Sequence, residues 1–387
     1  MYLKLIYIVL IFFMILLSLL RIFFAERYFK KIEMSIGNSI NEEEYTVIQP
    51  ILSGDPRLRE DLNENLKKLS KMRFLWLIDR SDTEARNIVM EISGKENYSN
   101  RIEILEIEEV PQEVNPKIFK LNKAIKKVRT KYTIILDDDS IIDTGRIKEL
   151  SIYEKLEEEW LATGIPYNYG VDGFWSELVA SFVNSNSITT YFTMSYLEKN
   201  KTINGMFYIA NTDIFKKYNV FEKIKYWLCD DFALAQYLIS KKVTLIQTGI
   251  FCNTRTTVKT FEQYLLLMKR WLLFTKIYIK NAATLRFIVF ILIPSILPSI
   301  LLIIGIMTGI GYISIILTVL LLKSLLLYRL RFRILKKEEG KKVIIKEVIN
   351  DFIILFIFIY SIVTGPVIKW RNKKIRVVDG KIRYEKL

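Results

Sequence analysis

Histidine is absent from the 387 residues of this chain, and only two cysteines and eight prolines are present. Without imidazole, no mechanism can use a histidine base or a histidine metal ligand, so general-base work falls to a carboxylate. The two cysteines, Cys229 and Cys252, lie outside the apolar runs and lack the spacing of a metal site, which is compatible with reduced thiols. The chain also lacks internal repeats and low-complexity linkers.

Apolar residues make up 51% of the chain, and the first concentrated run is at the N-terminus. Residues 5–20 carry no charge, follow Lys4 and precede Arg21, with no small-x-small cleavage pattern. These features are typical of an uncleaved anchor helix rather than a signal peptide. We therefore predict an N-terminal transmembrane anchor over residues 1–25.

Two further apolar runs follow in the C-terminal third. Residues 287–322 are too long for one crossing of a hydrocarbon core about 30 Å thick. Three glycines interrupt this run, namely Gly305, Gly309 and Gly311. Two transmembrane helices are therefore expected within 283–330. Residues 352–368 form a shorter run with Gly365-Pro366 near its end. This third membrane segment, placed at 350–368, is long enough to cross, dip into the bilayer or lie flat.

Charge predicts the orientation of these segments, because Lys and Arg beside membrane helices stay on the cytoplasmic side. Basic residues outnumber acidic ones nine to three over 323–349 and eight to two over 369–387. We expect a basic cytoplasmic segment at 331–349 and a basic cytoplasmic tail at 369–387, so a re-entrant 350–368 is preferred over a full crossing. A net charge of +15 concentrated beside membrane segments indicates anionic lipid head groups rather than nucleic acid as the partner.

Between residues 40 and 260, short β-rich runs alternate with helical patterns. Strands are predicted over 45–50, 73–78, 102–107 and 132–136, and helices over 58–69, 83–92 and 116–128. This order predicts an α/β domain with a largely parallel sheet. In such sheets, ligands bind beyond the carboxyl ends of the strands.

Three consecutive carboxylates, Asp137, Asp138 and Asp139, follow the buried-strand pattern at 132–136. Adjacent carboxylates repel one another, so a fold that gathers them at a strand end favours a hard divalent cation there. A metal held by acids on one side can bind phosphates on the other. The alternative is a solvated acidic turn, against which the preceding apolar strand argues.

Further acids lie at the ends of other predicted elements. Asp79 and Asp82 follow the second predicted strand, so they are expected at the same sheet edge as Asp137–139. Asp230 and Asp231 immediately precede a helical pattern. Taken alone, that pair fits ordinary helix caps, because acids are favoured at helix N-termini.

Two helical patterns carry aromatic residues. Residues 261–271 end in Lys269, Arg270 and Trp271, just before the apolar run at 287–322, which is also typical of an interfacial helix with snorkelling cations. Residues 174–182 predict either an interfacial helix that admits an acceptor head group or an ordinary amphipathic core helix.

The ordered acids and the Arg-Trp pair resemble the motifs of membrane-bound glycosyltransferases of families 2 and 21, and more narrowly the ceramide glucosyltransferase branch. The resemblance runs from about residue 45 to the C-terminus. It implies a GT-A fold, which is a Rossmann-like α/β domain with a mostly parallel sheet, here flanked by N- and C-terminal transmembrane helices. Supporting motifs are Asn115-Pro116-Lys117, Leu121-Asn122, Gly164-Ile165-Pro166-Tyr167, Asn204-Gly205-Met206 and Trp370-Arg371.

The resemblance implies specific roles for the site residues. Asp137 and Asp139 match the D-x-D motif that places Mg²⁺ or Mn²⁺ on a diphosphate. Asp231 matches the general base. Arg270 and Trp271 match the end of the (Q/R)-x-x-R-W motif, whose arginine faces the leaving group. The first position of that motif departs from the pattern, because Leu267 stands where Gln or Arg is expected.

Less specific contacts are also implied. Asp82 matches the residue that holds the uracil or ribose, with Asp79 as the alternative, and Asp138, the middle residue of D-x-D, is expected to tolerate substitution best. The residues assigned to the nucleotide-sugar are Asp82, Asp79, Asp138, Lys117 and Gln49, and the candidate donor or acceptor contacts are Asp230, Gly205, Gln263 and Lys269.

Together these expectations describe an inverting, metal-dependent glycosyltransferase that moves a hexose, with glucose favoured, from a UDP-sugar to the hydroxyl of a ceramide-like membrane lipid. The predicted organisation is a cytoplasmic catalytic domain at 40–260 and an interfacial helix at 261–282. The alternatives are a polyprenyl-phosphate or processive polysaccharide transferase, and a catalytically degenerate membrane scaffold, which Leu267 favours and the intact acids disfavour.

Overall fold

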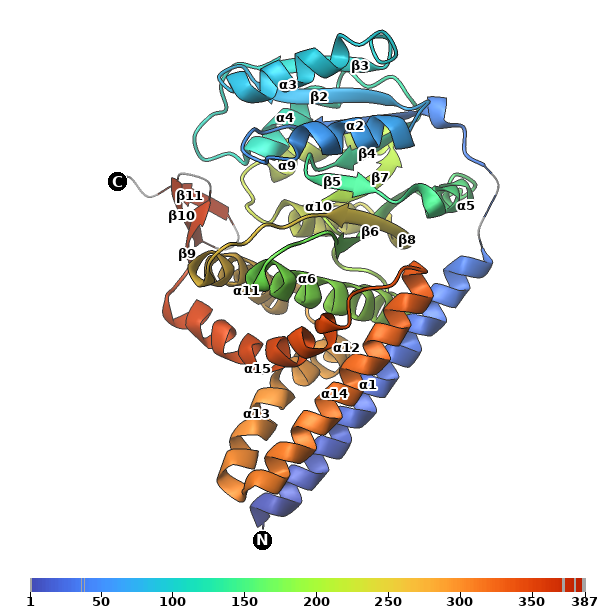
Figure 1. Cartoon of the computed structure of the whole chain (residues 1–387). Helices are drawn as coiled ribbons and strands as arrows, with labels where there is room; N and C mark the ends of the chain where they lie inside the picture. The colour runs from blue at the N-terminus through green and yellow to red at the C-terminus, as the bar shows by residue number, and fades with distance from the viewer. Residues whose placement is uncertain (1, 36, 38, 371–372, 379–380, 385–387) are drawn as a thin grey trace. The chain divides into compact units, whose positions relative to one another are not determined.

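The computed structural model describes residues 2–35, 37, 39–370, 373–378 and 381–384. Its chain divides into two compact units, shown with their elements in Figure 1. We call one the α/β unit; it comprises Ile32–Pro166, Asn200–Arg255 and Trp370–Leu387. We call the other the membrane-helix unit; it comprises Met1–Lys31, Tyr167–Lys199 and Thr256–Lys369.

An eight-stranded sheet in the order β3-β2-β1-β4-β7-β6-β8-β5 carries the α/β unit. The pairs among β1, β2, β3 and β4 are parallel, and β7 then pairs antiparallel with both β4 and β6. The strands are β1 (Tyr45–Pro50), β2 (Arg73–Asp79), β3 (Ile102–Ile107), β4 (Tyr132–Leu136), β5 (Ser140–Ile142), β6 (Trp160–Asn168), β7 (Phe207–Asn211) and β8 (Thr244–Thr254). A smaller sheet contains β9 (Val367–Trp370), β10 (Lys373–Val378) and β11 (Lys381–Tyr384).

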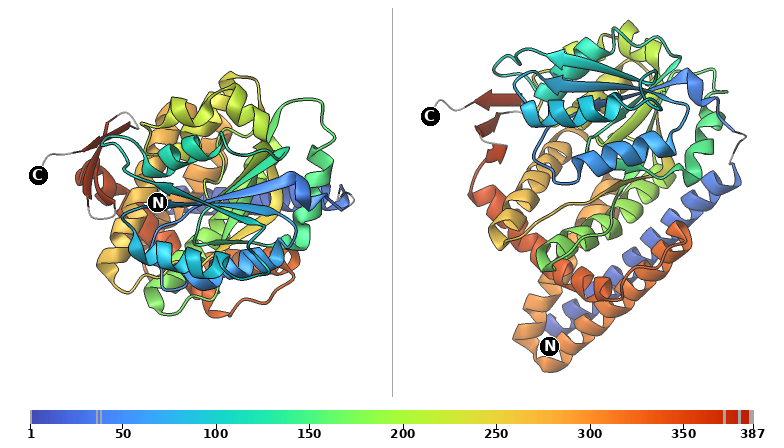
Figure 2. Two further views of the ribbon diagram at one scale, coloured as in Figure 1. Left: turned by 90° about the horizontal axis from the view of Figure 1, so that it is seen from above. Right: turned by 45° about the horizontal axis from the view of Figure 1, so that its top comes forward.

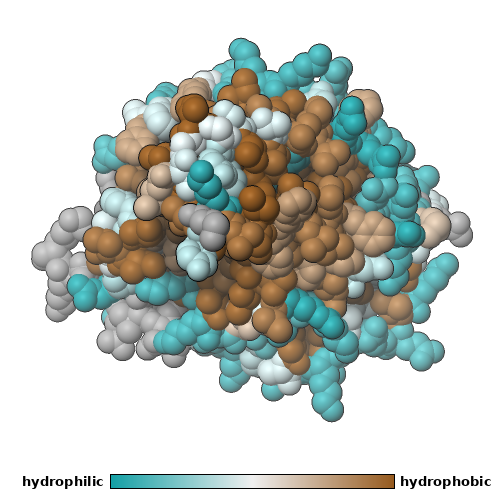
Figure 3. Space-filling model, turned by 90° about the horizontal axis from the view of Figure 1, so that it is seen from below, coloured by the Kyte–Doolittle hydropathy of each residue, from teal (hydrophilic) through white to brown (hydrophobic). Residues whose placement is uncertain are grey.

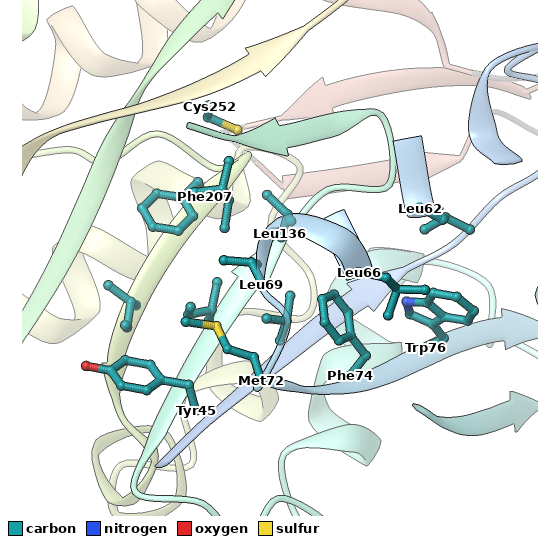
Figure 4. Close-up of a cluster of buried hydrophobic side chains, with 14 of the residues drawn as sticks. Tyr45, Leu62, Leu66, Leu69, Met72, Phe74, Trp76, Leu136, Phe207 and Cys252 are labelled. Atoms are coloured by element: carbon teal, nitrogen blue, oxygen red, sulfur yellow. The ribbon is translucent and has the colours of Figure 1, made fainter. Parts of the chain in front are cut away.

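Helices cover both faces of the large sheet (Figure 2) because successive strand residues point to opposite faces. On one face, Trp76 packs with Leu62 and Leu66 of α2 (Figure 4), and Val47 belongs to the same buried cluster. On the other, Ile48 and its neighbours pack against α4 and the later helices. The helices are α2 (Leu58–Lys68), α3 (Thr83–Ser93), α4 (Pro116–Ala124), α5 (Leu150–Tyr153), α8 (Thr212–Lys217), α9 (Val220–Ile224) and α10 (Asp230–Ser240), with 3₁₀ turns at Glu42–Glu44 and Thr144–Glu149.

The α/β class with a mostly parallel sheet typical of GT-A is confirmed, and four of its strands lie where the sequence predicts them. The helix predicted over 116–128 is shorter and ends at Ala124, where Ile125 closes the last turn. No strand beyond β4 is predicted from the sequence, so the antiparallel pairing of β7 with β4 and β6 is a finding of the structure.

The membrane-helix unit contains the long helices α1 (Tyr2–Met34), α13 (Ile293–Thr308) and α14 (Ile310–Leu335). Its other elements are α6 (Phe174–Ser187), a π-helical segment η3 (Ile188–Phe192), α7 (Thr193–Leu197), α11 (Phe261–Ala282), α12 (Leu285–Phe287), a π-helical segment η4 (Ile288–Leu292) and α15 (Lys342–Val363). Gly309 connects α13 to α14 at φ +125°, a conformation that favours glycine. The expected pair of helices joined at a glycine is present.

Three helical stretches are long and apolar enough to span a membrane: Tyr2–Met34, Leu285–Thr308 and Ile310–Leu335. Exposed apolar side chains such as Phe12, Ile306 and Leu322 agree with this, and the face seen in Figure 3 is largely apolar. α15 is not among the candidates found in the part of the chain that the structure describes. The stretch expected as a basic segment at 331–349 is divided between the end of α14, a short connection and the start of α15.

Candidate active site

The carboxyl edge of the parallel strands gathers the predicted acids of the α/β unit. Asp79 ends β2, and Asp137–139 follow β4. The loop after β1 lies between them, because the Leu52 N–H donates to Asp138 Oδ2 at 2.7 Å and the Ser53 N–H donates to Asp82 Oδ2 at 2.9 Å. Carboxylates that follow β2 and β4, the two strands on either side of β1, therefore hold consecutive amides of the loop after β1.

Lys117 joins three of the predicted motifs. Its Nζ lies 2.5 Å from Asp137 Oδ1 and 3.9 Å from Asp230 Oδ2, and it donates to the Gly205 carbonyl at 2.8 Å. Burial acts to lower the pKa of this lysine, but the two carboxylates outweigh it and raise the pKa above its usual value. Lys117 is therefore a permanent cation at the point where the acids of β4 and α10 meet.

The Asn115-Pro116-Lys117 motif has a local structural explanation. Asn115 is the N-cap of α4, and its Oδ1 accepts from the Lys117 N–H at 3.0 Å. Proline occupies the first helical turn, where no backbone donor is needed. Asn115 Nδ2 also donates to the Trp227 carbonyl at 3.1 Å, which fixes the start of α4 beside the segment that leads to Asp230.

Gly205 provides the close approach between this segment and the predicted base. A Cβ at Gly205 would lie 3.1 Å from Asp231 Cβ, which is tighter than most side chains accept, and 3.5 Å from its Oδ2, which is an ordinary contact distance. The Met206 N–H donates to Asn204 Oδ1 at 3.1 Å, and the Met206 carbonyl accepts from the Asp137 N–H at 3.0 Å. The Asn204-Gly205-Met206 turn thus lies between Asp137 and Asp231.

Asp230 and Asp231 occupy the first turn of α10, whose N-cap Cys229 makes no side-chain capping bond. Asp231 Oδ1 accepts from the Cys229 thiol at 3.1 Å and from the Phe232 N–H at 2.6 Å. Burial raises the pKa of both carboxyls, although Lys117 acts against this rise. A carboxyl with a raised pKa is better suited to accept a proton near neutral pH than an ordinary helix cap.

Lys120 is a site residue that sequence reasoning missed. Its Nζ lies 2.9 Å from Asp79 Oδ2, and its side chain is only 3% exposed. Because Lys117 and Lys120 are three residues apart on one helix, they share a face, and that spacing is the signal that would have predicted a second lysine at the acidic edge. Asp79 therefore has a fixed cationic partner.

Asp82 and Gln49 have structural contacts of their own. Asp82 caps α3, accepting from the Ala85 N–H at 3.0 Å; burial would raise its pKa, but hydrogen bonds from the Ser53 and Ala85 backbones lower it. Gln49 is fully buried, and its Oε1 accepts from Trp76 Nε1 at 3.0 Å. The structure thus gives Gln49 a core position between β1 and β2.

The acidic edge fits a divalent cation that is shared with a phosphate. Burial and mutual repulsion raise the pKa values of Asp138 and Asp139, which is the crowding that a cation relieves. Among the described residues, no group of three or more His, Cys, Asp or Glu side chains is placed to hold a metal by itself. Mg²⁺ is commonly held by one or two carboxylates together with substrate phosphates, and Asp137 and Asp139 are the pair that the D-x-D pattern predicts for this role.

The predicted Arg-Trp motif lies on α11, in the membrane-helix unit. Trp271 stacks with Phe182 of α6 at a centroid distance of 6.3 Å. Lys269 is 7% exposed and donates to the Val367 carbonyl at 2.9 Å, while Gln263 Oε1 accepts from the Lys259 N–H at 2.8 Å. Arg270 lies beside Lys269 on the same helix and is partly buried.

Leu267, the departure from the motif, belongs to an apolar cluster with Tyr264 and Met268 of α11 and Ile357 of α15. α6 joins the same cluster through Leu178, so it is packed against α11 and α15. An apolar residue at position 267 has a clear packing role in this chain. Leucine offers no polar group at this position, where the motif expects Gln or Arg.

No curated protein sequence matches the chain. Among solved structures, a mannosyltransferase of Pyrobaculum calidifontis in complex with GDP-Man and Mn²⁺ has a TM-score of 0.49 and 12% identity, covering 92% of this chain and 98% of that one. Residues 1–349 of TarS of S. aureus in complex with UDP-GlcNAc have a TM-score of 0.36 and 14% identity, covering 88% and 96%. A family model matches residues 10–383, so the chain belongs to glycosyl transferase family 21.

Proposed function

We propose that this glycosyltransferase moves a hexose, with glucose favoured, from a UDP-sugar to the hydroxyl of a membrane lipid, with inversion at the anomeric carbon. The observation that carries the proposal is the position of Lys117, which contacts Asp137, Gly205 and Asp230 together. Three motifs that are far apart in the sequence thereby meet at the edge where parallel sheets bind ligands.

Asp231 is the proposed general base. Inversion needs one attack from the face opposite the leaving group, and a single carboxylate suffices to accept the acceptor's proton. Cys229 and the Phe232 amide occupy Oδ1, which leaves Oδ2 for the incoming hydroxyl. The raised pKa of Asp231, caused first by burial, favours proton acceptance near neutral pH.

The leaving nucleoside diphosphate requires positive charge. Asp137 and Asp139 are the proposed holders of Mg²⁺ or Mn²⁺, which when bound would stabilise the negative charge that develops on the phosphates. Lys117 adds a fixed cation beside Asp137. Arg270 is proposed to face the same diphosphate and Trp271 to complete its motif, as the family resemblance implies. Asp82, or alternatively Asp79, is proposed to hold the uridine.

The membrane supplies the proposed acceptor. Three stretches of the chain are able to span a bilayer by length and composition, so a lipid substrate would be at hand without diffusion through water. The excess of basic residues beside these stretches supports a cytoplasmic α/β unit, where UDP-sugars would be available.

The test is to incubate membranes containing the full chain with a panel of labelled UDP-sugars and to identify the lipid product by mass spectrometry. We expect one labelled hexosyl-lipid, formed with Mg²⁺ or Mn²⁺, and a loss of about 10²–10⁴-fold in Asp231→Asn. Asp213→Asn is the matched control, because Asp213 is exposed in the first turn of α8.

Three results would contradict the proposal. Full activity in Asp231→Asn would exclude this residue as the base. A polyprenyl-phosphate sugar or a long polymer as the product would identify a different acceptor class. Binding of UDP with Mn²⁺ but transfer of no sugar would favour a membrane scaffold.

A further inference from the structure

The loop between β1 and α2 contains two backbone amides that no strand pairs. β1 ends at Pro50, and the Ile51 N–H still donates to the Leu77 carbonyl of β2 at 2.8 Å. The next two N–H groups, those of Leu52 and Ser53, donate to side chains instead. Backbone donors away from water need partners, so the side chains that accept these two bonds determine the course of the loop.

The two acceptors lie on opposite sides of β1. Asp138 Oδ2, after β4, accepts from the Leu52 N–H at 2.7 Å, and Asp82 Oδ2, at the start of α3, accepts from the Ser53 N–H at 2.9 Å. Both distances are those of well-formed hydrogen bonds. The middle of the loop is therefore held between two carboxyl groups that are 56 residues apart in the sequence.

The strand register explains why Asp138 is in reach of this loop. Ile48 lies beside Ile135 in the parallel β1–β4 pair, so three residues further along both strands Ile51 comes beside Asp138. On the other side of the loop, Lys120 Nζ lies 3.4 Å from the Ile51 carbonyl. The polar groups around the end of β1 thus converge on three consecutive residues of the loop.

The far end of the loop is fixed by a local turn. Asp55 Oδ1 accepts from the Arg57 N–H at 2.8 Å, and the Asp55 carbonyl accepts from the Leu58 N–H at 3.1 Å, which starts α2. Between the two ends, Gly54 has φ +108°, and a Cβ built on it would meet no atom within 4 Å. The middle of the loop therefore borders open space, where a ligand has room.

A donor bound as proposed would have to pass this loop. Asp82, proposed for the uridine, follows β2, whereas Asp137 and Asp139, proposed for the metal, follow β4. β1 lies between these two strands in the sheet. A nucleoside diphosphate that extends from one set of acids to the other crosses the carboxyl end of β1, which is where ligands bind in parallel sheets.

We propose that Asp138 is a positioning residue, which holds the Leu52 amide and thereby fixes the loop 51–54 as one wall of the site for the sugar-nucleotide donor. Its role depends on an acceptor oxygen and not on metal ligation. The D-x-D motif alone predicts that any residue is tolerated at this position, whereas the bond to Leu52 predicts that Asn is tolerated and Ala is not. The effect on the donor rests on the proposed function, but the anchoring of the loop does not.

Hydrogen–deuterium exchange of the full chain in detergent tests the anchoring without donor or metal. In Asp138→Ala, peptides that contain residues 51–54 should exchange about tenfold faster, because the Leu52 amide loses its acceptor. In Asp138→Asn, exchange should stay within about threefold of the wild type, because the amide oxygen of Asn accepts the same bond. Peptides from β7 serve as the internal reference for global unfolding.

Asp143→Ala is the matched control for the exchange measurement. Asp143 Oδ1 accepts from the Gly145 N–H at 3.0 Å, which is the same kind of bond between a carboxyl group and a loop amide, after β5 instead of β4. Its loss should leave the exchange of residues 51–54 unchanged. A general loosening of the chain by loss of any such bond would instead raise exchange in both variants.

Binding of UDP with Mn²⁺ tests the consequence for the donor. Asp138→Ala should weaken UDP binding about tenfold and leave the midpoint of the Mn²⁺ titration unchanged, and Asp138→Asn should restore most of the affinity. In the transferase assay the KM for the UDP-sugar should rise by the same factor at constant kcat. A metal ligand would behave differently, since its replacement by Asn shifts the Mn²⁺ titration.

The outcomes separate this inference from the proposed function. Unchanged exchange of residues 51–54 in Asp138→Ala would overturn the anchoring, whether or not the chain transfers sugar. A shifted Mn²⁺ titration in Asp138→Asn would identify Asp138 as a ligand and overturn the positioning role. Faster exchange with unchanged UDP affinity would remove the loop from the donor site. A wild-type chain that binds no UDP would contradict the proposed function, while the exchange result would still decide the anchoring.

Discussion

The two units treat buried charge in opposite ways. In the α/β unit, carboxylates outnumber cations at the sheet edge, where Lys117 contacts Asp137 and Asp230 and Lys120 contacts Asp79. In the membrane-helix unit, Arg331 is 1% exposed and is bonded to both Glu339 and Glu347. The first arrangement leaves negative charge for a ligand to neutralise, whereas the second is internally paired.

The charges of the sheet edge therefore serve ligand binding, whereas those of the membrane-helix unit serve the stability of the helix packing. A surplus of negative charge at a partly exposed sheet edge attracts a counter-ion. Neutralising one acid there should change the fold little. A buried pair among helices is sensitive in another way, because removal of one partner leaves an uncompensated charge. Substitutions in the two units should therefore change different measurements.

The largest effect is expected from the paired network of the membrane-helix unit. Arg331→Met leaves Glu339 and Glu347 without their cation and should lower the free energy of unfolding by about 3–5 kcal/mol. The measurement is denaturant unfolding of the full chain in detergent.

Arg333→Met is the control on the same helix, because Arg333 is 62% exposed and pairs with Glu26 at the surface. Its effect should be small. Equal destabilisation by the two variants would show that the buried network does not hold the helices together.

The acidic edge should respond in activity rather than in stability. Asp139→Asn removes one of the two proposed metal carboxylates and should lower transfer about 10²–10³-fold, with a shift of the Mn²⁺ titration to higher concentration. The thermal unfolding midpoint should change little. An unchanged metal titration would exclude Asp139 as a ligand, and Asp213→Asn serves as the exposed control.

Asp138, the middle acid, separates what the sequence predicts from what it does not. The D-x-D pattern predicts that this residue tolerates substitution best, yet its Oδ2 holds the Leu52 amide in the loop after β1. Sequence motifs report chemistry shared with relatives, whereas this bond depends on how one loop passes a strand end. The strands at 45–50 and 132–136 were predictable because both are short runs rich in β-branched and aromatic residues.

The helix α15 begins at Lys342, ten residues before the apolar run at 352–368. The apolar run alone could not predict this start, because the first turns of the helix contain charged residues. Its first turns carry Lys346 and Glu347, which are buried and form ion pairs with Glu177 and Arg331 of other helices. Charges that look solvated in sequence are thus tertiary contacts. Leu267 is similar, since its apolar role depends on α15 packing against α11.

A smaller effect on activity is expected at Lys120, which positions Asp79 from a buried location. Lys120→Met should raise the KM for the UDP-sugar about tenfold, with a smaller change in kcat, because it disturbs binding of the donor and not the proton transfer. Lys123→Met is the control, since Lys123 is exposed on the same helix. A fall in kcat at constant KM would contradict a positioning role.

The smallest effect is expected on the pH dependence of stability, from a buried carboxyl of the α/β unit that lies outside the proposed active site. Asp61 on α2 is 3% exposed, and burial raises its pKa from 3.8 to about 7. Between these values the unfolded chain has lost the proton that the folded chain keeps, so stability falls as pH rises, by at most about 1.4 kcal/mol per pH unit. Asp61→Asn cannot ionise and should therefore flatten this slope. The measurement is unfolding of both full-length proteins at pH 5 and pH 6. It is followed by tryptophan fluorescence, to which the buried Trp76 contributes, and it gives the change in stability of each protein between the two pH values. If both proteins lose stability equally over this step, Asp61 is ionised in the fold, and this acid resembles those of the sheet edge instead of being a neutral core group.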